Sequence, residues 1–445
     1  MFLIRRLQSF GHEFSLMWQM ESGRNILYLY IEVVFAGLLS AAASFNSAYI
    51  LRLGGSRELV GLLSSIPALV AVALYLPSAR VLERKTRHGP WIVGSLLLAR
   101  SGYLGILALP LLLANLLPEL TVGILVAITA PSVFFTTGWS PMLSDVIPER
   151  SRATVLAWRS ILSSATIAPL VYLFGLALDR GAFPGNYQWM YAVGLFGGLT
   201  SVALISRIKI PEREQGAPKS GAPSPAADEA ETRAWRRTLD NLRQTDRGFL
   251  RIITNTLLFD LGAWTVAPLY IIFFVRELGA PDSWIGLNAT LAHLGVVAGF
   301  WGWRRIINRT GESRAMFIAL PMVSMYAFMV ALVPNLNFIL FAGFLINVVA
   351  PGVNLSHGVL FLRLLPAERR HTWMAIYSTV MNVGAFVCPL IGVAISNVIG
   401  IVPTLLIGGT MRLAGAMLFY LFPVVEEGAL RLPGSILRPR PFGHR

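Results

Sequence analysis

Long apolar runs alternate with short polar segments along most of the chain. A helix of about 17 to 25 predominantly apolar residues is long enough to cross the hydrocarbon core of a bilayer. The pattern therefore predicts an all-α membrane protein with twelve transmembrane helices. The first six are expected at 27–51, 58–79, 91–113, 120–143, 154–178 and 189–206, and the second six at 249–275, 284–303, 316–334, 338–361, 373–395 and 401–423.

One long polar stretch divides these runs into two sets of six. It is rich in Pro, Gly, Ala and charged residues, a composition that is typical of a flexible tether. The predicted organisation is an N-terminal six-helix bundle over 1–207, a cytoplasmic linker over 208–248, a C-terminal six-helix bundle over 249–423 and a disordered cytoplasmic tail over 424–445.

The two sets repeat each other in sequence. LGGSRELVGL at 53–62 returns as LGAPDSWIGL at 278–287, and RVLER at 80–84 returns at the same offset as RIINR at 305–309. Six spans is an even number, so the second set enters the membrane in the same orientation as the first. The halves are therefore expected to be pseudo-symmetric, as parallel repeats about an axis along the membrane normal.

The distribution of charge predicts the orientation of the chain in the membrane. Only 13% of the residues are charged, but the formal net charge is +14. Lys and Arg collect on alternate loops, as the positive-inside rule requires of the cytoplasmic side. We therefore expect a monomer that crosses the lipid bilayer of the plasma (inner) membrane many times, with both termini in the cytoplasm. Topology accounts for the positive charge, so no nucleic acid partner is expected.

The loops that follow spans 2 and 8 carry a recognisable motif. Glu83 and Arg84 in the first copy, and Asn308, Arg309 and Gly311 in the second, occupy the core of a Gly-x-x-x-Asp-Arg-x-Gly-Arg-Arg pattern. With twelve spans and the internal repeat, the chain resembles the major facilitator superfamily over essentially its whole length. The resemblance implies that these loops act as a cytoplasmic gate that helps hold an outward-facing state. The alternative is that the arginines serve the positive-inside rule alone.

Both copies depart from the family motif, because Ala79 and Arg304 replace its first glycine and Thr86 replaces the second in the first copy. The small-residue pattern that runs from Gly384 to Gly392 in span 11 resembles the signature of the family's exporters. That weak match favours efflux over uptake, although small residues also serve close helix packing.

The sequence lacks the residue patterns of an ATP-binding loop, a metal site and a disulfide. None of the three lysines follows a glycine, so the usual phosphate-binding loop of an ATP-driven pump is missing. The six histidines show no metal-binding pairing, and Cys388, the only cysteine, cannot form an intrachain disulfide. We therefore predict no cofactor, no metal site and no enzymatic activity.

Ionisable residues inside the spans are the candidates for function. A charge at the bilayer centre costs roughly 2.5 to 3.5 kcal/mol or more unless it faces the bundle or water. Asp260 in span 7 and Glu32 in span 1 belong to spans that line the central cavity in the resembled family. Either carboxylate is a candidate for cation binding or proton coupling, and the alternative is a structural ion pair with an arginine. Arg100 and Arg412 lie on spans 3 and 12, which are peripheral in the resembled family, so structural pairing or snorkelling is favoured for them over anion binding.

Polar and aromatic residues on other spans complete the predicted pocket, which suits an amphipathic or aromatic organic substrate. Each of them is also explained by packing or by a hydrogen bond between helices. They are Asn46 and Tyr49 on span 1, Thr136 and Trp139 on span 4, Trp264 on span 7, and Asn347, Asn354 and His357 on span 10. His293 on span 8 is a further candidate for coupling.

The sequence thus favours a secondary active transporter that moves a small organic solute by alternating access, with proton-coupled efflux preferred. Uptake on the same fold is the first alternative. A membrane sensor, a lipid scramblase and a membrane-embedded enzyme are the others, and the enzyme would need a catalytic cluster at one interface, which the sequence lacks.

Overall fold

The computed structural model of the chain describes residues 21–83, 88–112, 117–209, 247–365 and 370–423. Within these ranges every element is helical, and twelve spans are long and apolar enough to cross a membrane. The predicted all-α membrane fold with twelve transmembrane helices is therefore confirmed. The spans run Glu21–Arg52, Arg57–Leu82, Gly89–Leu111, Leu117–Val146, Glu149–Arg180, Gly185–Ile205, Gly248–Glu277, Asp282–Thr310, Glu312–Leu332, Leu336–Leu364, Ile376–Ile399 and Ile401–Leu421.

Most spans extend past the predicted apolar runs, because helices continue into polar residues at the membrane surface. Three spans contain an interruption that hydropathy does not predict, and each of these is divided between two elements. The helices are α2 (Glu21–Ala43) and α3 (Asn46–Arg52) in span 1, α4 (Arg57–Glu83), α5 (Gly89–Leu112), α6 (Leu117–Ala127) and α7 (Thr129–Val146) in span 4, α8 (Glu149–Arg180), α9 (Gly185–Ile205), α11 (Arg247–Ile272) and the π-helix η1 (Phe273–Glu277) in span 7, α12 (Asp282–Thr310), α13 (Glu312–Leu332), α14 (Leu336–Leu364), α15 (Arg370–Ile399) and α16 (Ile401–Leu421).

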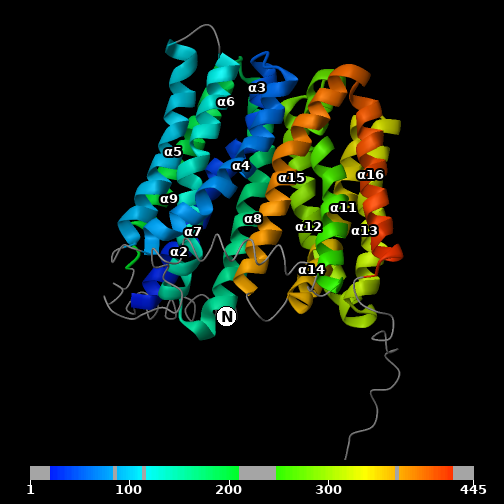
Figure 1. Cartoon of the computed structure of the whole chain (residues 1–445). Coiled ribbons are helices and arrows are strands. Elements are labelled where there is room, and N and C mark those ends of the chain that lie inside the picture. Colours follow the sequence, from blue (N-terminus) through cyan, green and yellow to red (C-terminus); the bar gives the residue numbers. More distant parts are fainter. Residues whose placement is uncertain (1–20, 84–87, 113–116, 210–246, 366–369, 424–445) are drawn as a thin grey trace, which may run out of the picture.

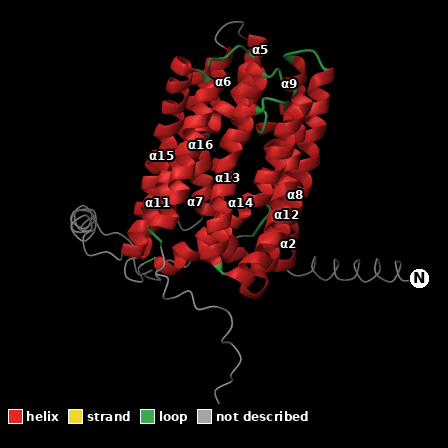
Figure 2. Ribbon diagram, turned by 90° about the vertical axis from the view of Figure 1, so that its right-hand side faces the viewer, coloured by secondary structure: helices red, strands yellow, loops and turns green. Residues whose placement is uncertain are grey.

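The spans stand side by side and run alternately up and down (Figures 1 and 2). After twelve crossings, the chain at Leu421 lies at the same end of the molecule as Glu21. We call this the Arg363 end, and the opposite end, which holds the turn 53–56 and the turn 278–281, the Arg52 end. The Arg52 end is at the top of Figure 1.

Helix packing is densest within each set of six spans. We call residues 21–209 the N-half and residues 247–423 the C-half. In the N-half α2 packs on α8 and α9, while in the C-half α12 packs on α14 and α11 packs on α15 and α16. The halves meet mainly where α8 contacts α12 and where α4 contacts α15.

Small residues let the two halves approach closely. A Cβ atom added at Gly286 of α12 would lie 2.6 Å from the Val171 carbonyl oxygen of α8, and one at Gly175 of α8 would lie 2.5 Å from the Asp282 carbonyl oxygen of α12. Only glycine permits contacts of this kind between backbones. These positions fix the α8 and α12 contact near the Arg52 end.

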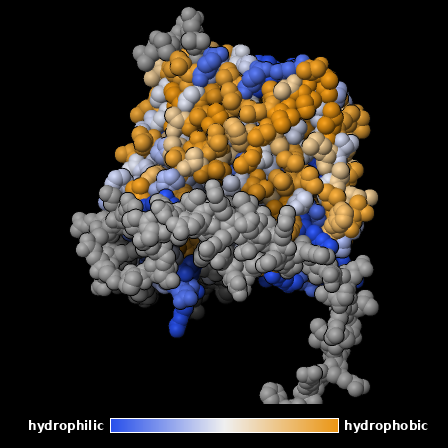
Figure 3. Space-filling view, in the orientation of Figure 1, coloured by the Kyte–Doolittle hydropathy of each residue, from blue (hydrophilic) through white to orange (hydrophobic). Residues whose placement is uncertain are grey.

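The surface shows the pattern of a membrane protein, with apolar residues around the middle and polar residues gathered toward the two ends (Figure 3). Exposed apolar side chains such as Leu98, Trp301 and Val398 are 62%, 69% and 84% exposed, as expected of residues that face lipid. The predicted linker and tail lie outside the described residues, apart from 208–209 and 247–248.

Candidate functional site

A cavity of about 270 Å³ lies inside the C-half, between α11, α13, α14, α15 and α16. Three of the predicted site residues, Asp260, Asn354 and His357, line it together. The other lining residues are Thr256, Phe259, Met316, Leu320, Val323, Ala350, Val353, Tyr377, Arg412 and Phe419.

The cavity holds a carboxylate and a guanidinium that do not pair with each other. Asp260 on α11 makes no hydrogen bond or ion pair with any residue that the structure describes. Arg412 on α16 instead lies over the ring of Phe259, with its Cζ atom 4.6 Å from the ring centroid. Its Nε atom is buried and has no hydrogen-bond partner among the described residues. Both charges are therefore available to a molecule in the cavity.

The neutral polar residues of the cavity have more contacts. The Thr256 hydroxyl and the His357 Nε2 atom are 2.9 Å apart, so one ring nitrogen of this histidine is occupied. The His357 ring stacks at 6.0 Å from Phe361 and at 6.2 Å from Tyr377. These contacts hold the histidine in place beside the cavity, while Asn354 is exposed.

Glu32 does not join this cavity and lies in the N-half. Its carboxylate is 2.9 Å from an Arg159 nitrogen, and the residue is only 4% exposed. Arg159 also donates to the Leu29 carbonyl oxygen at 2.7 Å and lies 4.9 Å from the centroid of the Trp139 ring. This is the structural ion pair that the sequence left as an alternative for Glu32.

Asn46 and Tyr49 lie in a packed cluster of tyrosines near the Arg52 end. The Asn46 side chain contacts the hydroxyl groups of Tyr191 at 3.0 Å and of Tyr103 at 3.4 Å. Tyr49 is 1% exposed and stacks on Tyr187 with the ring centroids 4.9 Å apart. The geometry of both residues is that of helix packing inside the N-half.

The other predicted pocket residues also have local contacts. Thr136 and Asn347 donate to carbonyl oxygens of their own helices, at 3.0 Å and 2.8 Å. Trp264 packs on α15, where a Cβ atom at Gly384 would come within 2.6 Å of its ring. His293 is half-buried on α12 and does not line the cavity.

The predicted gate residues lie at the Arg363 end. Asn308 and Arg309 are exposed near the end of α12, and Gly311 makes the turn to α13 with φ at 83°, a conformation that favours glycine. Glu83 is the last residue of α4. Its side chain and the whole of Arg84 lie outside the described residues.

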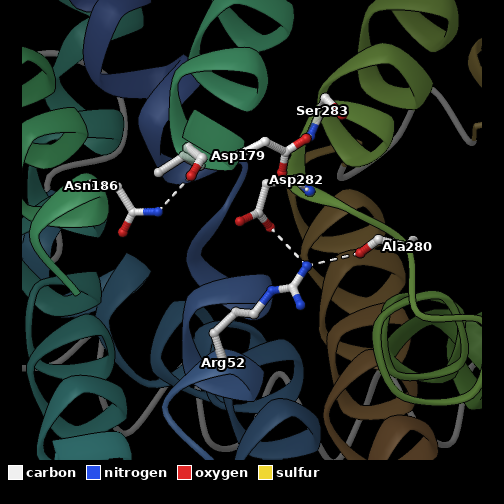
Figure 4. A network of polar contacts seen from close by, with 7 residues as sticks. Arg52, Asp179, Asn186, Ala280, Asp282 and Ser283 are labelled. Atoms are coloured by element: carbon white, nitrogen blue, oxygen red, sulfur yellow. Dashed lines mark hydrogen bonds and ion pairs between the residues drawn. The ribbon is translucent and has the colours of Figure 1, made fainter. Parts of the chain in front are cut away.

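Charged residues join the two halves at the Arg52 end. Arg52 of α3 lies 3.4 Å from the Asp282 carboxylate of α12 and donates to the Ala280 carbonyl oxygen at 2.8 Å (Figure 4). Asp179 of α8 accepts hydrogen bonds from the backbone N–H groups of Asp282 at 2.8 Å and Ser283 at 3.1 Å. An N-half carboxylate thus caps the first turn of a C-half helix.

A second set of links lies between α4 and α15 and around the turn 53–56. Arg57 is 3.8 Å from Glu277 and donates to the Ser396 carbonyl oxygen at 3.3 Å. Asn397 donates to Glu58, and Arg276 donates to the Gly55 carbonyl oxygen. At the Arg363 end, by contrast, the ion pair of Arg363 with Glu312 at 2.8 Å stays within the C-half.

Sequence reasoning missed two parts of this arrangement. Arg412 was expected to be structural because span 12 is peripheral in the resembled family, but it lines the cavity with Asp260. Arg52, Asp179 and Asp282 lie at span ends, where charges are ordinary. A possible signal was that Arg52 is one of the few basic residues at an end that is poor in them.

Comparisons with known proteins agree with this architecture. Residues 252–444 match the family model described as Major Facilitator Superfamily. A bacterial homolog of the human lysosomal transporter Spinster, in an inward-facing and unoccupied conformation, superposes with a TM-score of 0.63 at 13% identity, covering 90% of this chain and 96% of that chain. No curated protein sequence matches.

Two further solved structures have the same fold. The nucleoside transporter NupG gives a TM-score of 0.64 at 12% identity, with 89% of this chain and 99% of that chain covered. A D-xylose-proton symporter gives 0.61 at 14% identity, with 91% and 97% covered. At these identities the likeness concerns the fold alone.

Proposed function

We propose that the chain is a secondary transporter and not an enzyme, that it moves a small organic solute by alternating access, and that Asp260 carries a coupled proton. The basis is that residues 252–444 match the model of the major facilitator superfamily, and that the solved structures of the same fold are transporters. The protein is a multi-pass membrane protein.

The observation that carries the proposal is the unpaired Asp260 carboxylate in a cavity that also has polar and aromatic walls. A carboxylate away from bulk water is less stable in its charged form unless a cation or hydrogen-bond donor compensates it. Exchange between a proton and a solute at this carboxylate is therefore the simplest coupling mechanism that these residues support.

The links at the Arg52 end support one state of an alternating-access cycle. Arginines are abundant at the Arg363 end, among them Arg150, Arg207, Arg304 and Arg314. By the positive-inside rule we place that end in the cytoplasm of a cell whose plasma membrane the protein crosses. The joined Arg52 end is then closed toward the outside. Opening it requires that the Arg52 and Asp282 pair and the Asp179 cap break.

The small residues of span 11 do not indicate the direction of transport. A Cβ atom at Gly392 would come within 1.8 Å of the Thr265 carbonyl oxygen, and one at Gly384 would meet Trp264. Close packing of α15 on α11 explains these glycines without a role in export. The sign of the measured flux distinguishes export from uptake.

Proton flux in liposomes tests the proposal. Purified protein is reconstituted with an entrapped pH dye, and amino acids, small amines and small carboxylates are added in turn outside. Wild type should change the internal pH with a transported solute, and the sign of that change shows whether the proton moves with or against it. Asp260→Asn should abolish the proton signal.

The matched control is Glu312→Gln, which removes a carboxylate of the same half that lies outside the cavity. This variant should keep the proton signal of wild type. An unchanged proton signal in Asp260→Asn would remove this carboxylate from the mechanism.

A further inference from the structure

We propose that the solute is a small zwitterion, held with its anionic group on Arg412 and its cationic group near Asp260. This inference rests on the proposed function, because it takes the C-half cavity to be the transport site. It deepens that function by naming the chemical class of the substrate.

The cavity contains one charge of each sign. A guanidinium and a carboxylate line the same space, and no ion pair joins them among the described residues. Charges taken out of water are costly unless they are paired and hydrogen-bonded. A ligand with one charge of each sign would compensate both groups at once, whereas a purely cationic or purely anionic ligand would leave one uncompensated.

An aromatic contact positions the Arg412 guanidinium away from Asp260. The Phe259 ring holds the Arg412 guanidinium at 4.6 Å, in a geometry that favours a cation over an aromatic face. Arg412 lines the cavity and its guanidinium makes no hydrogen bond with any residue that the structure describes, so its donors remain free for an anionic oxygen. Arginine binds carboxylate and phosphate groups with two parallel hydrogen bonds, which suits this position.

The other polar groups that line the cavity are neutral or already form a hydrogen bond. The His357 Nε2 atom contacts the Thr256 hydroxyl at 2.9 Å. Asn354 and Tyr377 offer an amide and a phenol. Within the lining, Asp260 and Arg412 therefore dominate the electrostatic selection of the ligand.

The volume of the cavity limits the size of the ligand. The cavity volume of about 270 Å³ lies just below the roughly 300 to 1,000 Å³ that is usual for drug-sized ligands. Leu320, Val323 and Val353 form an apolar wall against which a short carbon skeleton can pack. A compact metabolite of about amino-acid size fits these limits better than a drug-like compound.

The test compares ligands that share a skeleton and differ only in charge. The probes are 4-aminobutyrate, butylamine and butyrate in one set, and phenylalanine, phenethylamine and 3-phenylpropionate in the other. Affinity is measured for the full-length protein in detergent from the dependence of its unfolding temperature on ligand concentration. In at least one set the zwitterion should bind about tenfold or more tightly than either singly charged analogue, because each charge-assisted hydrogen bond contributes about that much.

Variants assign each charge to its partner. Arg412→Gln should reduce the affinity for the zwitterion to that for the amine, and Asp260→Asn should reduce it to that for the carboxylate. Arg412→Lys keeps the positive charge and should retain a weaker preference for the zwitterion, which guards against loss of binding through misfolding. Glu312→Gln, which removes a carboxylate of the same half outside the cavity, should leave the order of affinities unchanged.

Equal affinities for zwitterion and amine in wild type, or no zwitterion-selective shift in either set, would overturn the inference. These results are distinct from failure of the proposed function. A zwitterion that binds selectively but crosses liposomes no faster than in protein-free controls would remove transport and leave the ligand class standing.

Discussion

Each half of the molecule places a carboxylate and an arginine within its spans, but the two pairs are built differently. In the N-half, Glu32 and Arg159 are in direct contact at 2.9 Å, and Arg159 also donates to the Leu29 carbonyl oxygen. In the C-half, Asp260 and Arg412 line a cavity of about 270 Å³ and form no ion pair.

The difference does not come from the aromatic neighbours. Arg159 lies 4.9 Å from the Trp139 ring centroid and Arg412 lies 4.6 Å from that of Phe259. What differs is whether the carboxylate reaches the guanidinium. A closed pair stabilises the helices that carry it, whereas an open pair leaves both charges for a ligand. An intramembrane charge alone therefore does not identify a site, and the geometry of its partner does.

The largest effect should follow from removal of the arginine of the closed pair. Arg159→Gln leaves the Glu32 carboxylate buried without its cation, and loss of one partner of a buried pair costs about 3 to 5 kcal/mol. The free energy of unfolding, measured by denaturant titration in detergent, should fall by that amount.

The double variant Glu32→Gln with Arg159→Gln controls for this effect. It removes both charges, so it should recover most of the lost stability. A double variant as unstable as the single one would show that Arg159 contributes through packing on Trp139 and not through its pair.

The same substitution in the open pair should have a smaller effect on stability and a larger effect on ligand binding. Arg412→Gln breaks no ion pair and loses only the contact with the Phe259 ring, so the free energy of unfolding should fall by about 1 to 2 kcal/mol, less than in Arg159→Gln. Zwitterion affinity should instead fall about tenfold or more, because a charge-assisted contact to the ligand is lost. Denaturant titration and ligand binding on one preparation measure both. A stability loss as large as that of Arg159→Gln would show that the two arginines contribute equally to the stability of the fold.

The twelve spans were predictable because hydropathy over about twenty residues is a local property of the chain. Asp260 was singled out for a similar reason, since a carboxylate in an apolar run is costly wherever its side chain points. The breaks near Ser44 and Ile128, and the π-helix η1, leave no hydropathy signal. The break at Ile128 has a local cause in Pro131, which has no N–H to donate to the Ala127 carbonyl oxygen and whose ring crowds that carbonyl.

The partners of the charges were not predictable from one sequence. Whether Glu32 meets Arg159 or opens into a cavity depends on the rotation of α2 and α8 about their axes, which the hydropathy of the two spans does not set. Arg412 was assigned a structural role because span 12 is peripheral in the resembled family, and the sequence does not show that it lines a cavity with Asp260. Asn46 and Tyr49 had helical spacing that suited a pocket, but spacing does not distinguish a pocket from a tyrosine cluster.

The link between the halves should show a smaller effect than either buried pair. Arg52 is 32% exposed at its side chain and Asp282 is 7% exposed, so loss of this partly solvated pair should cost about 1 kcal/mol. In Arg52→Gln the population open at the Arg52 end should rise about fivefold.

Spin labels at Ala182 and Pro334, two exposed positions on opposite halves at this end, measure that opening by their distance distribution in a Cys388→Ser background. Arg363→Gln breaks a pair that lies within the C-half and should leave the distribution unchanged. A shift in the control, or none in Arg52→Gln, would contradict a role for this link in holding the halves together.

The smallest effect is expected from a pair of the same chemistry at the surface. Lys209 lies 3.7 Å from Glu21, and the two side chains are 65% and 59% exposed. Water already solvates both charges, so Lys209→Gln should change the free energy of unfolding by no more than about 0.5 kcal/mol, and that change should shrink as salt is raised. Denaturant titration at low and high NaCl measures it. A loss comparable with that of Arg159→Gln would show that pairing alone, irrespective of burial, stabilises the helices of this half.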